Sequence, residues 1–557
     1  MAGMGGDDLP ALEKKASNNS ERDARKFCDG IHGTLSASSP PVVRTSLKAK
    51  EYSMSRPRLG KCVIFNNKNF DLHTNKPERT GTDLDANDLR STFRDLGFET
   101  VRYNDLSCKE TKDTLKNLGE QDYSDDDCFV CCFLTHGDSD VLYATDGKFP
   151  VGAVMEPFHG DVCPSLLGKP KLFFIQACRG DTLKSGTQAV KDAADSPTRV
   201  FRIPTHADVL VAYSTVPGFY SWHDSTEGSM RGSWFIQALC SVLRERAHFA
   251  DVLSMLTVVC RRVSLDCELY TPNDLHMHCK KQVPFITSTL TRNCRTQSAS
   301  PCPVPPTPPE AEEYNMPHRR RGKCVIFNYL RFESHLKAAE RTGTKKDADS
   351  LQSCFRSLGF ETVTHDDLSV RQTKETLDNH GKQDYSDDDC FVCCFLTHGG
   401  HDHLYGTDGK FSVNDIVEPF LDEACPSLIG KPKLFFIQAC RGDRLDSGAQ
   451  VVFDTADSPT WSYKIPDHPD ILVACCTVPG FYAWRNKVKG SWFIQALCSV
   501  LEELAGSVDL LSMLTVVNRR VALEHKSYTP KNPHMCCKKQ VPSFTSTLIR
   551  RVCFRQN

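Results

Sequence analysis

The sequence predicts an α/β fold that occurs twice in one chain. Short apolar runs alternate with amphipathic helical patterns, which is typical of a mostly parallel β-sheet flanked by α-helices on both faces. The run Gly60-Lys-Cys-Val-Ile-Phe-Asn returns at Gly322, an offset of 262 residues. A repeat of this length indicates a duplicated domain rather than a solenoid of short units.

The offset divides the chain into four parts. They are a polar, disordered leader (1–51), a first domain (52–295), a proline-rich linker (296–313) and a second domain (314–557). The stretch Ser300-Pro-Cys-Pro-Val-Pro-Pro-Thr-Pro-Pro predicts a semi-rigid polyproline spacer. A ligand for an SH3 or WW domain is the alternative for this stretch.

Within each copy, strand and helix patterns follow one another. Cys62-Val-Ile-Phe is typical of a strand. Leu89, Phe93 and Leu96 then fall at helical spacing, with Gly97 as a helix stop. We expect further strands at 128–134 and 171–175, and later helices at 234–243 and 252–263.

The composition excludes several function classes. Lys plus Arg number 68 and Asp plus Glu 70, so neither nucleic acid nor an anionic membrane surface is an expected partner. No secretory signal is visible, and no apolar run approaches the roughly 18 residues of a membrane helix. We therefore expect a cytoplasmic protein whose 27 cysteines are mostly buried, reduced thiols.

Metal binding is the alternative for one pair of cysteines. Cys128 and Cys131 have a C-x-x-C spacing, but their run is typical of a buried strand and no second pair follows. We expect no structural metal and no cofactor.

Two predicted strands end in a reactive residue. One ends in His136 and Gly137, and the other ends in Cys178. If the strands are parallel, both side chains emerge at the carboxyl edge of the sheet, where an imidazole can take the proton of a thiol. Taken singly, Cys178 is better explained as another buried cysteine and His136 as a loop-end histidine. Their return as His398 and Cys440 favours a catalytic pair.

These residues lie within motifs that resemble the caspase family. Gln176-Ala-Cys-Arg-Gly180 and its repeat beginning at Gln438 match the caspase nucleophile signature. Further similar segments are Glu78-Arg-Thr-Gly-Thr82, Thr135-His-Gly137, Phe219-Tyr-Ser-Trp222, Gly232-Ser-Trp-Phe-Ile-Gln237 and Lys280-Lys-Gln-Val-Pro284. The resemblance covers both copies and is closest to the short-leader executioner caspases. It implies two tandem caspase-like domains in a thiol protease that cleaves proteins after aspartate (Asp-x-x-Asp) in apoptosis.

The resemblance also implies roles for individual residues. Cys178 and Cys440 would attack the scissile carbonyl, with His136 and His398 handling protons. Backbone N–H groups of the two cysteines and of the glycines that follow the histidines would hold the oxyanion. Those glycines are Gly137 and Gly399.

In the family, two arginines and a glutamine bind the substrate aspartate. Arg79 and Gln176 occupy two of these places in the first copy, and Arg341, Gln438 and Arg485 occupy all three in the second. A planar guanidinium suits a carboxylate because it donates two parallel hydrogen bonds. The implied aromatic walls are Tyr220, Trp222, Trp234, Tyr482, Trp484 and Trp492, with core packing as the alternative.

The two copies differ at one of these places. Where the second copy has Arg485, the first has His223, which is shorter and only partly charged at neutral pH. We expect weaker aspartate binding or shifted specificity in the first domain, unless Arg231 compensates. The alternative function is a caspase-like regulator or scaffold in which the first domain, or both, is weak or inactive.

Activation is expected to follow the zymogen pattern of the family. Asp195 and Asp457, each followed by serine, lie where caspases are cut into large and small subunits. The 51-residue leader is short for a recruitment domain, so we expect an upstream activating protease. No aspartate occurs between Asp274 and Asp347, so an aspartate-specific protease would leave the linker intact. We therefore expect pairing of caspase units within one chain, with pairing between chains as the alternative.

Overall fold

The computed structural model describes residues 49–138, 140–178, 207–216, 232–267, 281–295, 312–318, 320–400, 403–442, 445, 468–529 and 532–555. Several predicted site residues lie outside the described residues: Asp195, Tyr220, Trp222, His223, Arg231 and Asp457. The same holds for positions 1–48 of the predicted leader and for most of the predicted linker.

Among the described residues, the first repeat contributes six strands to the main sheet. They are β1 (Arg58–Asn66), β2 (Glu99–Asn104), β3 (Asp126–Leu134), β7 (Lys171–Gln176), β8 (Val209–Tyr213) and β9 (Phe285–Ser288). Its helices are α2 (Thr82–Asp95), α3 (Cys108–Gly119), α4 (Gly152–Met155), α5 (Trp234–Arg246) and α6 (Val252–Arg261). A small sheet follows β3 and contains β4 (Gly137–Asp138), β5 (Val141–Ala144) and β6 (Gly147–Pro150).

The second repeat has the same order of main strands and helices. Its main strands are β10 (Arg320–Asn328), β11 (Phe360–Asp366), β12 (Asp388–Leu396), β15 (Lys433–Gln438), β16 (Ile471–Cys475) and β19 (Ser543–Ser546). Its helices are α7 (Thr344–Ser357), α8 (Val370–Gly381), α9 (Asn414–Val417), α10 (Trp492–Leu504) and α11 (Leu510–Arg519). Two short pairs are β13 (His403–Tyr405) with β14 (Lys410–Ser412), and β17 (Arg485–Asn486) with β18 (Gly490–Ser491).

The predicted mostly parallel sheet is confirmed in both repeats. In the first repeat the strand order is β2-β1-β3-β7-β8-β9, and every neighbouring pair is parallel except β8 with β9. All nine residues of β3 are buried, so its two cysteines at C-x-x-C spacing are part of the core. The apolar run is uninterrupted because helices cover both faces.

Alternate residues of each strand face two different layers. In β1, Cys62 and Ile64 belong to a core cluster with Leu89 of α2, whereas Val63 and Phe65 belong to another cluster on the opposite face. The expected helix in this region is α2, and Gly97 just after it has a left-handed φ of 96°. The last expected helix ends as α-helix at Arg261 and continues as the π-helix η4 (Arg262–Asp266).

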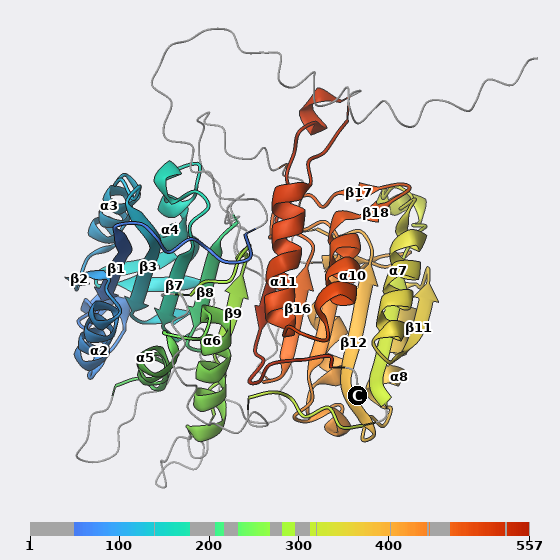
Figure 1. Ribbon diagram of the computed structural model, residues 1–557, viewed down its shortest axis with the longest axis horizontal. Helices are drawn as coiled ribbons and strands as arrows, with labels where there is room; N and C mark the ends of the chain where they lie inside the picture. The colour runs from blue at the N-terminus through green and yellow to red at the C-terminus, as the bar shows by residue number, and fades with distance from the viewer. Residues whose placement is uncertain are drawn as a thin grey trace, which may run out of the picture. The chain divides into compact units, whose positions relative to one another are not determined.

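The two repeats form one twelve-stranded sheet because β9 pairs antiparallel with β19 (Figure 1). Thr287 lies opposite Thr545, its own equivalent at the offset of 258, and their hydroxyl oxygens are 3.3 Å apart. Such a contact of a residue with its own equivalent is the property of an isologous, two-fold interface.

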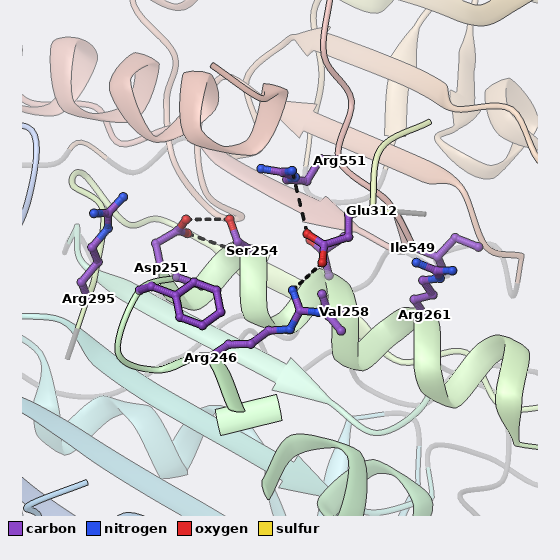
Figure 2. A pocket seen from close by; sticks show the side chains of 12 residues that line it. Arg246, Asp251, Ser254, Val258, Arg261, Arg295, Glu312, Ile549 and Arg551 are labelled. Carbon is purple, nitrogen blue, oxygen red and sulfur yellow. Dashed lines mark hydrogen bonds and ion pairs between the residues drawn. The ribbon is translucent and has the colours of Figure 1, made fainter. Parts of the chain in front are cut away.

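Segments just before each repeat also contact the other repeat. The guanidinium of Arg519 donates to the carbonyl oxygen of Ala49 at 2.8 Å. Arg246 donates to Glu312 at 2.7 Å, and Arg551 lies 3.9 Å from the same carboxylate. Figure 2 shows these three side chains in a cavity of about 270 Å³ that residues of both repeats line. The pairing therefore extends beyond the strands.

In the part of the chain that the structure describes, no helix combines the length and the apolar character needed to cross a bilayer.

Candidate active site

The predicted reactive residues follow directly on two paired strands in each repeat. In the first, Leu134 of β3 lies opposite Gln176 of β7, and the N–H of Thr135 donates to the carbonyl oxygen of Gln176 at 3.1 Å. His136 and Cys178 therefore emerge at the same carboxyl edge, as expected. The second repeat has the same register between β12 and β15, which brings His398 and Cys440 to the equivalent edge.

A glycine after each histidine permits this close approach. A Cβ atom on Gly137 would lie 2.5 Å from the carbonyl oxygen of Cys178. A Cβ atom on Gly399 would lie at the same distance from the carbonyl oxygen of Cys440. Such distances are far below van der Waals contact, so only glycine fits without displacing the backbone of the cysteine.

Each histidine is oriented by a backbone carbonyl. Nε2 of His136 lies 2.8 Å from the oxygen of Pro77, and Nε2 of His398 lies 2.7 Å from the oxygen of Ala339. A carbonyl only accepts, so in the neutral ring Nε2 carries the proton and Nδ1 remains the basic nitrogen. Burial lowers the pKa of both histidines to about 4, so both rings are neutral at pH 7.

The Cys440 sulfur lies among donors and cations. The N–H of Ala483 is 3.5 Å from Sγ. Burial raises the pKa of the Cys440 thiol, and the Ala483 N–H, Arg341 and Arg485 partly oppose this rise. The resting pair is therefore a thiol next to a neutral imidazole, and removal of the proton requires the histidine.

Arg341 is almost completely buried and only partly hydrogen-bonded. Its Nη1 donates to the oxygen of Tyr329 at 3.0 Å and to Oγ1 of Thr344 at 2.7 Å. Its Nε and Nη2 are buried without a hydrogen-bond partner. Burial, followed by the positive charge of Arg485, lowers the pKa of Arg341 to about 9. Two cations therefore repel each other next to Cys440, an arrangement that an anion would stabilise.

A carboxylate of the chain is already engaged elsewhere. Asp347 affects both Arg341 and Arg485 electrostatically. However, its two oxygens accept hydrogen bonds from the N–H and the hydroxyl of Ser491. Asp347 therefore does not accept a hydrogen bond from the buried Nε and Nη2 of Arg341, which have no hydrogen-bond partner among the described residues.

In the described part of the first repeat, Arg79 is the equivalent of Arg341. Arg79 donates from Nη1 to the oxygen of Asn67 at 3.1 Å and to Oγ1 of Thr82 at 2.6 Å, and its buried Nη2 has no hydrogen-bond partner. Burial lowers the pKa of Arg79 to about 10. Gln176 is buried in this repeat and Gln438 in the other, each at the end of the strand before the cysteine.

Four aromatic side chains lie in a row in the second repeat, with Tyr482 edge-on to Trp484 and the remaining rings stacked. Ring centroids are 5.2 Å apart for Tyr482 and Trp484, 5.8 Å for Trp484 and Trp492, and 5.1 Å for Trp492 and His525. We call these four residues the aromatic stack. His525 could not be predicted from the repeat, because the equivalent position of the first copy is Cys267. In the first repeat, Trp234 is partly buried against the core.

Comparison with known families gives a match over both repeats. The Caspase domain matches residues 59–295 and again residues 321–553. The chain belongs to the caspase family. The duplicated fold, with His and Cys at one sheet edge in each repeat, is therefore that of a cysteine-type endopeptidase.

The relatives that match this chain are themselves caspases. Caspase-1 of Spodoptera frugiperda is 42% identical over 289 residues, which are 52% of this chain and 89% of that protein. Caspase-7 of Gallus gallus is 43% identical over 247 residues, or 43% of this chain and 78% of the relative. Caspase-3 of Oryctolagus cuniculus is 43% identical over 262 residues, or 47% and 91%.

A crystal structure of the Spodoptera frugiperda protein aligns with 47% of this chain and 98% of its own, at 39% identity and a TM-score of 0.41.

Proposed function

We propose that the chain is an executioner-type endopeptidase that cleaves proteins after aspartate, with the second caspase domain as the principal catalytic unit. The observation that carries the proposal is Arg341, whose buried Nε and Nη2 lack a partner beside Arg485 and Cys440. A substrate carboxylate provides the missing anion and acceptor. A neutral side chain would leave the buried charge uncompensated, which selects against it.

The proposed reaction uses the resting thiol and the neutral imidazole. Nδ1 of His398 takes the proton of Cys440 as the sulfur attacks the scissile carbonyl, so that the S–C bond forms and the oxygen becomes an oxyanion. The N–H groups of Gly399 and Cys440 stabilise that oxyanion. The imidazolium then protonates the departing amine, and water hydrolyses the thioester with the same histidine as base. The first domain would use His136 and Cys178 in the same way.

Pairing within one chain is the second part of the proposal. The antiparallel contact of β9 with β19 and the hydrogen bond from Arg519 to Ala49 join the two repeats, which supports a single chain acting as a pair of caspase units. Activation of the zymogen would follow cuts after Asp195 and Asp457 by an upstream protease in the cytoplasm. The uncut linker would keep both catalytic domains at high effective concentration.

The decisive experiment compares four full-length proteins on a chromogenic Asp-x-x-Asp peptide: wild type, Cys178→Ala, Cys440→Ala and the double variant. We expect Cys440→Ala to remove most turnover, Cys178→Ala to have a mild effect and the double variant to be inactive. A wild-type protein that remains inert after cleavage at Asp195 and Asp457 would contradict the proposal and favour a scaffold.

A further inference from the structure

The loop that precedes β19 carries two adjacent cysteines that the proposed reaction does not use. The Sγ atoms of Cys536 and Cys537 are 3.7 Å apart, and both residues are partly exposed thiols. They follow the short helix η10 (Pro533–Met535) in a loop that projects beyond the end of α11 (red in Figure 1). The equivalent positions of the first copy are His278 and Cys279, so only the second domain has a pair of cysteines at this place in the fold.

The two thiols have different environments. A hydrogen bond with the backbone of Thr529 lowers the pKa of the Cys536 thiol, and contacts with Cys537 and Lys526 act in the same direction. The lowered pKa favours the thiolate form of Cys536, and the thiolate is the reactive form of a cysteine. Cys537 has a φ of 62°, in the left-handed region that a residue with a side chain seldom adopts.

The peptide group between the two cysteines is bound to Ser527. The N–H of Cys537 belongs to that peptide group and donates to the oxygen of Ser527 at 2.8 Å. The N–H of Lys538 donates to Oγ of Ser527 at 2.7 Å, and this hydroxyl donates to the oxygen of Met535 at 2.7 Å. Ser527 is two residues from His525, the last member of the aromatic stack.

We propose that Cys536 and Cys537 are a site of reversible oxidation, at which a hydroperoxide closes the thiols into a vicinal disulfide that displaces the aromatic stack. Adjacent Cα atoms lie about 3.8 Å apart across a trans peptide, whereas disulfides prefer about 4.4–6.8 Å. Closure therefore distorts the intervening peptide, which is the group that donates to Ser527. Strain of this kind makes the disulfide easy to reduce, as regulation requires.

The chemistry balances with a hydroperoxide as the oxidant. The Cys536 thiolate attacks the peroxide, so that an S–O bond forms, the O–O bond breaks and hydroxide leaves as water after taking a proton. The Cys537 thiol then attacks the sulfenic sulfur, so that the S–S bond forms and a second water departs. Two thiols lose two electrons in total, and hydrogen peroxide is reduced to two waters. A small dithiol reverses the step by exchange.

The chemical part is tested in the full-length Cys440→Ala variant, which removes the proposed nucleophile of the second domain. Trypsin releases residues 532–538, Asn-Pro-His-Met-Cys-Cys-Lys, with both cysteines in one peptide. After peroxide treatment, we expect mass spectrometry to show the loss of two hydrogens and resistance to alkylation until dithiothreitol is added. Independent alkylation or higher oxidation of the two thiols, without this species, overturns the proposal.

The structural part is read from tryptophan fluorescence of the same protein. We expect a reversible change on oxidation, because Trp492 stacks on His525, and no such change in Cys440→Ala, Cys537→Ser. The matched control is Cys536→His, which installs the residue of the first copy and removes the dithiol. A disulfide without a fluorescence change overturns the coupling to the aromatic stack.

The effect on catalysis rests on the proposed function and is measured in protein with Cys440 intact. We expect oxidation to raise KM several-fold for the Asp-x-x-Asp peptide in wild type, but not in Cys537→Ser, after removal of peroxide. Equal loss in both proteins overturns the coupling and assigns the loss to another thiol. If the reduced wild type has no peptidase activity, the proposed function is contradicted but the oxidation site is not. Mass spectrometry and tryptophan fluorescence still test the dithiol in that case.

Discussion

Replacement of Arg485 by histidine converts the proposed aspartate-binding residues of the second domain to those of the first. Arg485 is partly exposed, and its Nε donates to the oxygen of Thr342 at 3.1 Å, which orients the guanidinium. Hydrogen bonds to charged groups contribute about 1.5–3 kcal/mol, and solvent screening favours the lower end for an exposed partner. A loss of about 1.5–2 kcal/mol corresponds to a fall of about 10- to 30-fold in kcat/KM.

The assay is peptide turnover by processed Arg485→His protein in a Cys178→Ala background, so that only the second domain acts. We expect the loss to lie mainly in KM, because the arginine binds the substrate carboxylate in the ground state as well. Thermal stability should not fall, since the substitution also relieves repulsion of the buried Arg341. A change of less than threefold, or an equal loss with a neutral residue in place of aspartate, would refute the reasoning.

The reciprocal change tests the first domain. In a Cys440→Ala background, His223→Arg should raise turnover of the same peptide, because it supplies the second guanidinium that the first copy lacks. No gain in kcat/KM would contradict the expectation that His223 weakens aspartate binding in the first domain.

Three further predictions concern the catalytic edge, its pH dependence and the pairing. Gly399→Ala should abolish turnover by the second domain, because the added Cβ atom would lie 2.5 Å from the carbonyl oxygen of Cys440. The control is Gly506→Ala, whose Cβ atom would have no heavy atom within 4 Å and should leave kcat/KM within twofold. The acid limb of kcat/KM should lie well below pH 6.5, because the lowered pKa of His398, about 4, keeps the base neutral until the pH falls through that value; a limb near 6.5 with unchanged circular dichroism contradicts this. The uncut 62.3 kDa chain should sediment as a monomer, and the activated protein should show no cut within residues 296–320. A stable dimer of chains, or a fragment cut within residues 296–320, would contradict pairing within one chain.

Several features of this fold follow from local sequence. Uninterrupted apolar runs such as Cys128–Leu134 predict strands buried on both faces, and β3 is buried throughout. The placement of His136 and Cys178 at one edge follows from parallel pairing of two such strands. The sequence could predict these features because strand burial and the carboxyl-edge rule depend on short segments and on their direction.

Other features depend on contacts between residues far apart in the chain. The four residues of β9 and of β19 give a weak strand signal, and only their register shows that Thr287 meets its equivalent Thr545. The repeat comparison likewise gives no hint of His525, because its role depends on the position of Trp492.

By itself, the sequence determined that this protein is a duplicated α/β chain with a histidine, a cysteine and an arginine at corresponding places in each copy. The alternation of apolar and amphipathic segments predicts the fold class, and the repeated motif identifies these residues in each copy. Only the tertiary structure decided that the copies pair with each other through β9 and β19, and that the buried guanidinium of Arg341 keeps unsatisfied donors next to Arg485. The physical reason is that burial, register and the repulsion between two cations exist only once distant segments are packed together.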